Sequence, residues 1–228
     1  MTTLPGRAGA CAARRTAIWL AIALSCTYPL AFLLPPAWAL ENGAVENLQA
    51  AILACGCLLA LAHARRSRIA ADARMAAALV PVWAVLCGRE LSWGAVFRAP
   101  TGFVDGVALY SSSALWYKPL VAPAILVAAA WVVATAWRHR LAAQARLTLR
   151  LQPACWSLLA AAAAAGALAS CAEGHLGCAL PLSGPRAMAW EELLELFAYG
   201  ALLYAQYRAF HALGHDRAGA VTPLRSGG

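Results

Sequence analysis

The chain has 228 residues, of which 62% are hydrophobic and only 12% are charged, with a formal net charge of +8 at pH 7. Soluble domains usually carry about 25% charged residues, so this composition excludes an ordinary soluble domain. It predicts an all-α, polytopic integral membrane protein, because long apolar segments cross a bilayer as helices.

Six apolar segments are each about 20 residues long, which is enough to cross about 30 Å of hydrocarbon. The fifth is rich in alanine, and small residues favour packing against other helices over contact with lipid. We expect a single membrane domain over residues 1–228, with short cytoplasmic tails at 1–16 and 212–228. Its transmembrane helices are predicted at residues 17–39, 45–64, 75–93, 119–137, 154–172 and 190–210.

The first segment also has features of a cleaved signal peptide. Arg14 and Arg15 precede it, and residues 37–39 (AWA) have the small-x-small form of a cleavage site. The apolar part of a signal peptide is usually about 7–15 residues long, whereas this segment is longer and contains Pro29. We therefore expect a retained helix, and cleavage would not change the orientation of the later helices.

Arginine residues mark one side of the predicted bundle. The amino terminus, the loops at 65–74 and 138–152 and the tail after residue 207 hold 14 of the 18 basic residues. Cytoplasmic loops carry this kind of excess, so we expect six spans with both termini cytoplasmic, in the bacterial cytoplasmic (inner) membrane. Basic residues in short loops between spans indicate the lipid bilayer as a partner and no nucleic acid.

Eight of the ten acidic residues lie on or near the opposite, outer side. At 1.5 Å per residue from the inner arginines, Gln49, Glu90 and Glu192 lie about 24 Å up their helices, and Glu195 about 20 Å. Charged groups at this depth face a bundle interior or a wet cavity, and they usually form pairs. Arg89 lies at the same height. We therefore expect an outward-facing polar site formed by Glu46, Gln49, Arg89, Glu90, Glu191, Glu192 and Glu195.

Two structural interpretations of these residues stay open. The helix dipole favours acids at a helix start, which would account for Glu46, Glu191 and Glu192. An ion pair between Arg89 and a glutamate could also be purely structural. The first interpretation does not fit Glu90, which is near a helix carboxyl terminus.

Two outer loops carry further candidates. The loop at about 94–118 has aromatic residues that would form an interfacial belt or a lid over the polar site. Cys171 and Cys178 flank a second loop on the outer side, where a disulfide can form, so a bridge between them is one alternative. The belt or lid residues are Trp93, Phe97, Phe103, Trp116 and Tyr117.

The segment ELSWG at residues 90–94 resembles the E-x-S-W-G core of an uncharacterised family of multi-pass membrane proteins from bacteria and photosynthetic organisms. Members often continue with Gln-Arg, where this chain has Ala95 and Val96, and many have a glutamate-rich start to the last helix. The resemblance implies that Glu90, Trp93 and the glutamates of residues 191–195 act as a set. It implies no reaction.

Three classes of function are compatible with these features, and we expect a transporter-like protein first. Its carboxylate–arginine site would bind or transport a cation, a proton or a small polar ligand, because carboxylates bind hard cations and form proton relays. The second class is a membrane-embedded enzyme that acts on a lipid or isoprenoid-linked substrate by carboxylate acid–base chemistry. The third is a structural or assembly subunit, with a membrane protein partner or as a homo-oligomer. The sequence identifies no catalytic residue, metal ligand or cofactor beyond a divalent cation at this site.

Overall fold

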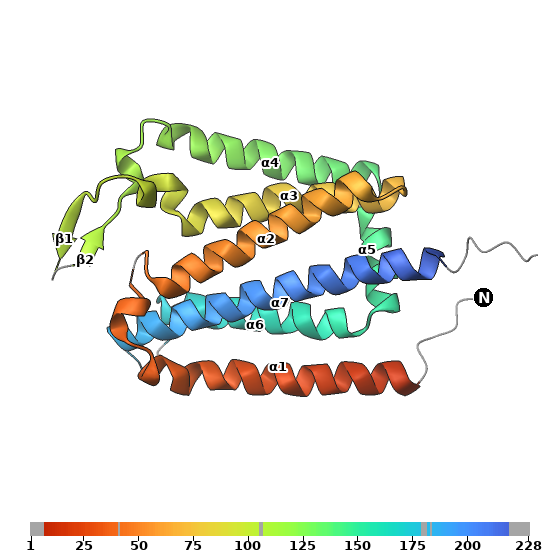
Figure 1. Ribbon diagram of the computed structural model, residues 1–228, viewed down its shortest axis with the longest axis horizontal. Helices are drawn as coiled ribbons and strands as arrows, with labels where there is room; N and C mark the ends of the chain where they lie inside the picture. The colour runs from red at the N-terminus through yellow and green to blue at the C-terminus, as the bar shows by residue number, and fades with distance from the viewer. Residues whose placement is uncertain (1–6, 41, 105–106, 179–181, 183, 219–228) are drawn as a thin grey trace, which may run out of the picture.

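The computed structural model describes residues 7–40, 42–104, 107–178, 182 and 184–218. Its long helices lie side by side along the longest dimension of the molecule (Figure 1). The all-α fold class is confirmed. The long helices of the described chain are α1 (Arg7–Leu33), α2 (Ala44–Arg66), α3 (Ala70–Glu90), α4 (Lys118–Arg138), α6 (Ala154–Ala172) and α7 (Pro185–Ala218).

Five helices in the described ranges are long and apolar enough to cross a membrane, and they correspond to the first five predicted spans. The sixth, α7, is longer than any of them, at 34 residues. Charged side chains such as Glu192, Glu195 and Arg208 interrupt its apolar sequence. The five qualifying ranges are Cys11–Leu33, Ala44–Arg66, Ala70–Glu90, Lys118–Arg138 and Ala154–Ala172.

The central helix of the bundle is α7, which packs against α1, α2 and α6. On the other side of α2 the chain adds α3 and then α4, so the bundle widens in one direction (Figure 1). The amino-terminal end of α1 and the carboxyl-terminal end of α7 lie at the same end of the bundle. The carboxyl end of α3 and the amino end of α7 lie together at the opposite end.

Two helices end earlier than the sequence predicts. The first ends at Leu33 instead of residue 39, because Pro35 and Pro36 follow it and proline disfavours helical backbone in the residue before it. The third ends at Glu90 instead of residue 93, because Trp93 has a left-handed backbone with φ of 57°.

The predicted tails are also shorter in the structure, because α1 already begins at residue 7 and α7 extends to residue 218. Residues 1–6 and 219–228 of these tails lie outside the described residues.

Two segments expected to be loops contain regular structure. The 138–152 segment holds α5 (Leu141–Leu151), which lies across one end of the bundle between α4 and α6 (Figure 1). After η1 (Pro36–Trp38) at the end of α1, the remaining short elements all lie in the 92–118 segment. They are η2 (Ser92–Phe97), the antiparallel strands β1 (Gly102–Val104) and β2 (Val107–Leu109), and η3 (Ser112–Ala114).

Small residues allow α6 and α7 to approach each other closely. Ala162 and Ala165 of α6 are buried in one cluster with Ala198 and Ala201 of α7. Such small-residue contacts are typical of helix packing within membranes. By contrast, α4 has no buried residue, so its apolar surface is free to face lipid.

A second contact joins α2, α3 and α7 in the middle of the bundle. The indole Nε1 of Trp83 donates a hydrogen bond to Gln206 Oε1 at 2.5 Å, and Gln206 Nε2 donates to the carbonyl oxygen of Gly56 at 2.9 Å. The Trp83 ring lies so close to α2 that a Cβ at Gly56 would be 2.6 Å from it. Glycine is therefore required where α2 and α3 meet.

Gly56→Ala should lower the free energy of unfolding by about 1–3 kcal/mol, the usual cost of overpacking a close contact. Gly166→Ala in α6 is the matched control, because a Cβ there has no neighbour within 4 Å. Thermal unfolding of the purified protein in detergent compares the two. Equal melting temperatures for both variants would contradict the close contact.

Candidate functional site

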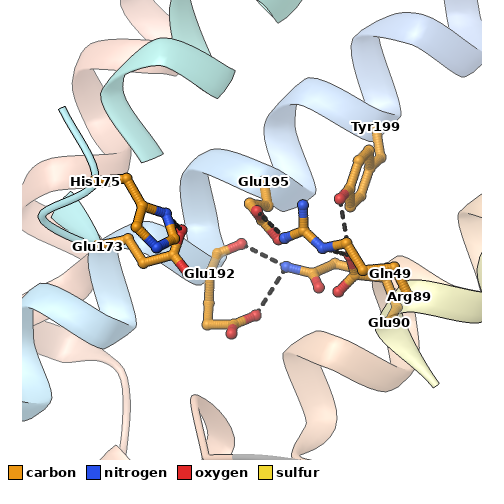
Figure 2. A network of polar contacts seen from close by, with 8 residues as sticks. All are labelled: Gln49, Arg89, Glu90, Glu173, His175, Glu192, Glu195 and Tyr199. Atoms are coloured by element: carbon orange, nitrogen blue, oxygen red, sulfur yellow. Dashed lines mark hydrogen bonds and ion pairs between the residues drawn. The ribbon is translucent and has the colours of Figure 1, made fainter. Parts of the chain in front are cut away.

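Three helices bring the predicted polar residues together at one end of the bundle. Gln49 comes from the second turn of α2, Arg89 and Glu90 from the end of α3, and Glu192 and Glu195 from α7. Figure 2 shows these side chains pointing toward one another across the space between the helices. Five of the seven residues predicted from their depth therefore lie together in the structure.

Gln49 is fully buried and binds Glu192 of α7 at two points. Its Nε2 donates to the backbone carbonyl oxygen of Glu192 at 2.8 Å and to the side-chain Oε2 at 2.9 Å. Both partners are acceptors, so the amide nitrogen must face them and the orientation of the amide is fixed. The other amide atom, Oε1, is buried with no hydrogen-bond partner in the described chain.

The guanidinium of Arg89 lies between two carboxylates (Figure 2). Its Nη2 donates to Glu195 Oε1 at 2.5 Å, and its Nε lies 3.4 Å from Glu90 Oε1. The Arg89 side chain is 54% exposed, whereas Glu90 is 6% and Glu195 is 14% exposed. Arg89 therefore lies on the exposed side of the two acids, and Glu90 is buried.

Tyr199 belongs to the site and was not predicted from the sequence. Its hydroxyl donates to Glu90 Oε1 at 2.8 Å, and both side chains are buried. Tyr199 follows Glu195 by four residues, a spacing that places both on the same face of α7. That spacing was the available signal, because tyrosine in a membrane helix otherwise suggests an interfacial residue.

Glu46 and Glu191 lie at the edge of the site. Glu46 Oε2 accepts a hydrogen bond from the backbone N–H of Asn42, so this side chain supports the start of its own helix. This agrees with the helix-start interpretation. The charge of Glu46 also acts on Glu90 and Glu192, and that of Glu191 interacts with Glu195. Both acids thus add negative charge to the site.

A contact between a histidine and a glutamate lies beside Glu192 on the loop after α6. His175 Nδ1 is 2.7 Å from Glu173 Oε2, and both side chains are exposed (Figure 2). Cys171 and Cys178 bracket this loop and are joined in a disulfide, with Cα atoms 5.3 Å apart. The loop therefore places one more acid, with its own partner, next to the buried cluster.

The aromatic residues of the segment between α3 and α4 fall into two groups. Phe97, Phe103 and Trp116 are exposed, which is compatible with an interfacial belt. Trp93 and Tyr117 instead pack where α3 meets α4, and the Tyr117 hydroxyl donates to the Trp93 carbonyl oxygen at 2.6 Å. Among the described residues, no hydrogen bond or ring contact joins these five aromatics to the carboxylates. A lid over the site stays a prediction.

The ELSWG segment forms a sharp turn at the end of α3. Ser92, Trp93 and Gly94 all have positive φ, and this turn brings the Trp93 ring back onto α3. The Trp93 ring packs so closely on Gly88 that a Cβ there would be 2.8 Å away. Within this segment, Glu90 therefore contacts Tyr199 and Trp93 packs on Gly88.

Comparison with protein-family models, with curated proteins and with solved structures finds no match for this chain. The resemblance to a family with an E-x-S-W-G motif therefore stays a prediction. Within the described residues, no group of three or more His, Cys, Asp and Glu side chains is arranged to hold a metal ion. A divalent cation as ligand also stays a prediction.

Tyr199→Phe should destabilise the protein by about 1–3 kcal/mol, because it removes a hydrogen bond to the buried Glu90 carboxylate. Tyr207→Phe in the same helix is the control, because Tyr207 is 51% exposed. Thermal unfolding in detergent measures both variants. A Tyr199→Phe protein as stable as Tyr207→Phe would show that the Glu90 contact contributes nothing.

Proposed function

We propose that the chain is a six-span protein of the bacterial cytoplasmic membrane, with α7 as the sixth span beside the five apolar helices. Its 34 residues exceed the roughly 20 that a span requires. Because α7 packs against α1, α2 and α6, its polar side chains can face other helices. Polar residues in membrane helices are tolerated in such interior positions.

Both termini lie on the cytoplasmic side in this proposal. The bundle end that carries the ends of α1 and α7 also carries the turn between α2 and α3, and α5, where the arginines are concentrated. An excess of arginine next to membrane spans is retained in the cytoplasm. The carboxylate site, at the opposite end, would then face outward.

The proposed function of this site is to bind, and in a transporter to move, a proton or a small cation. The observation that supports it most directly is the unpartnered Oε1 of Gln49, which is buried beside the Glu192 carboxylate. A carbonyl oxygen among carboxylates has only acceptors for neighbours. A bound cation, or a proton carried by a carboxyl group, would supply the missing positive partner.

The charge balance of the site supports the same proposal. Five carboxylates, those of Glu46, Glu90, Glu191, Glu192 and Glu195, surround the site. Of the described bases, Arg89 forms ion pairs with two of them, Glu90 and Glu195. Two like charges about 4 Å apart repel by about 4 kcal/mol at an effective dielectric constant of 20. Uptake of positive charge relieves this repulsion.

A purely structural role for Arg89 accounts for less of the geometry. The guanidinium satisfies Glu195 and contacts Glu90, but it makes no hydrogen bond to Gln49 or Glu192 within the described chain. That half of the site, formed by α2 and α7, keeps an acid and an unpartnered amide oxygen. Ligand binding is therefore proposed at Gln49 and Glu192.

Glu192→Gln should abolish cation binding. A ligand at a hundredfold excess over its Kd stabilises the folded state by about 2.7 kcal/mol. The melting temperature of the wild type should therefore rise when one of the candidate ions, H⁺, Na⁺, K⁺, NH₄⁺, Mg²⁺ or Ca²⁺, is added. Thermal unfolding in detergent across pH and salt measures the effect.

Glu173→Gln is the matched control for this experiment, because it removes the same charge from an exposed position beside the site. It should respond as the wild type does. A Glu192→Gln protein that keeps the full response, or a wild type that responds to none of these ions, would contradict the proposal.

Reporter fusions test the orientation independently. A reporter inserted at Ser67, in the turn between α2 and α3, should be cytoplasmic, and one inserted at Ser112, in η3, should be external. Paired alkaline phosphatase and fluorescent protein fusions distinguish the two sides. An external reporter at Ser67 would reverse the proposed orientation.

A further inference from the structure

An apolar cavity of about 290 Å³ lies among α3, α5, α6 and α7, toward the arginine-rich end of the bundle. On α3 its lining extends from Met75 to Leu86, which corresponds to about 16 Å at 1.5 Å per residue. Leu159 of α6 and Leu202 of α7 line it from the other helices. The cavity is thus an elongated apolar space that follows the helix axes.

The few polar side chains in the cavity wall are already engaged. Trp83 and Gln206 bond to each other, and Gln206 also binds the Gly56 carbonyl oxygen. Thr148 donates to the carbonyl oxygen of Gln144, and the Cys155 thiol contacts that of Ala205. With these groups satisfied, the wall favours a hydrocarbon chain over a polar ligand.

The short helix α5 closes the arginine-rich end of this cavity. Its Ala145 and Leu149 line the cavity, whereas Arg146 and Arg150 are exposed. A helix with one apolar face and one basic face typically lies in the plane of the membrane interface, with its basic side toward anionic headgroups. The orientation of α5 across the other helices agrees with this position (Figure 1).

Positive charge continues on both sides of α5. Arg74 at the start of α3 is exposed, and Arg138 and Arg140 before α5 are exposed as well. Asp72 at the same end is 2% exposed and accepts a hydrogen bond from Gln144 Nε2 at 2.7 Å. This acid is therefore turned into the protein, and the exposed surface next to the cavity is basic.

We propose that this cavity binds an anionic phospholipid from the leaflet next to the arginine-rich end of the bundle. One acyl chain occupies the space between Met75 and Leu86, and the phosphate lies against Arg146 and Arg150. The cavity supplies the apolar contact and the arginines supply the charge selectivity. This site is separate from the carboxylate site at the other end of the bundle.

Native mass spectrometry of the purified full-length protein tests the proposal, with phosphatidylglycerol and phosphatidylcholine of the same acyl chains as probes. Each basic side chain near a membrane surface contributes about 1 kcal/mol toward anionic lipid. The wild type should therefore retain phosphatidylglycerol roughly thirtyfold better than phosphatidylcholine. This ratio corresponds to about 2 kcal/mol for two arginines. The double variant Arg146→Gln and Arg150→Gln should lose this preference.

Two further variants separate charge from cavity. Ala145→Trp should fill the cavity and reduce retention of both lipids, and Ala209→Leu is a smaller filling change that tests the same point if the tryptophan variant does not fold. The control is the double variant Arg14→Gln and Arg15→Gln, which removes exposed arginines from α1, a helix that does not line the cavity. It should keep the wild-type preference.

Three outcomes would overturn the proposal. The first is equal retention of the two lipids by the wild type. The second is unchanged retention of phosphatidylglycerol by a folded filling variant. The third is a wild type that binds no lipid and instead forms a dimer through the cavity surface, when the filling variants are monomeric.

Discussion

The hydrogen bonds from Gln49 to Glu192 are the interaction on which the carboxylate site depends. They connect α2 to α7 at the end of the bundle where α7 begins, and they place one amide nitrogen against two acceptors of the same residue. Once that nitrogen is committed, the amide oxygen has to lie in the same buried space with no donor. A buried polar atom left without a partner costs about 1–3 kcal/mol, and the proposed ligand with positive charge would remove that cost.

The remaining contacts follow from the position of α7. Its small residues allow α6 to pack closely, and its polar residues face α2 and α3 at two levels. The first level along α7 holds Glu195 and Tyr199, and the second holds Gln206. A helix with this many polar groups is stable in a membrane only when its neighbours surround it. In the proposed six-span protein, that constraint explains why α7 is central although it is the least apolar of the long helices.

The sequence predicted the number and approximate ranges of the long helices, because each apolar segment is close to the length of a span. It also predicted that Gln49, Glu90 and Glu192 share one level, because helix rise converts residue number into depth. A pairing of Arg89 with a glutamate was predicted as well. Rotation about the helix axis was harder to predict, so the contact of Gln49 with Glu192 and the role of Tyr199 were missed. The α5 helix was missed because its arginines suggested a loop, although Leu141, Ala145 and Thr148 follow a helical spacing.

The central claim is that the carboxylate cluster of the folded protein holds a positive charge near Gln49. Infrared spectroscopy of the purified protein at pH 7, in buffer without metal ions or ammonium, tests it most directly, because protonated and ionised carboxyl groups absorb at different frequencies. We predict a protonated carboxyl band in the wild type that is absent from the Glu192→Gln variant. A spectrum with only ionised carboxylates, the same in both proteins and unchanged when Na⁺, K⁺, NH₄⁺, Mg²⁺ or Ca²⁺ is added, would contradict the claim.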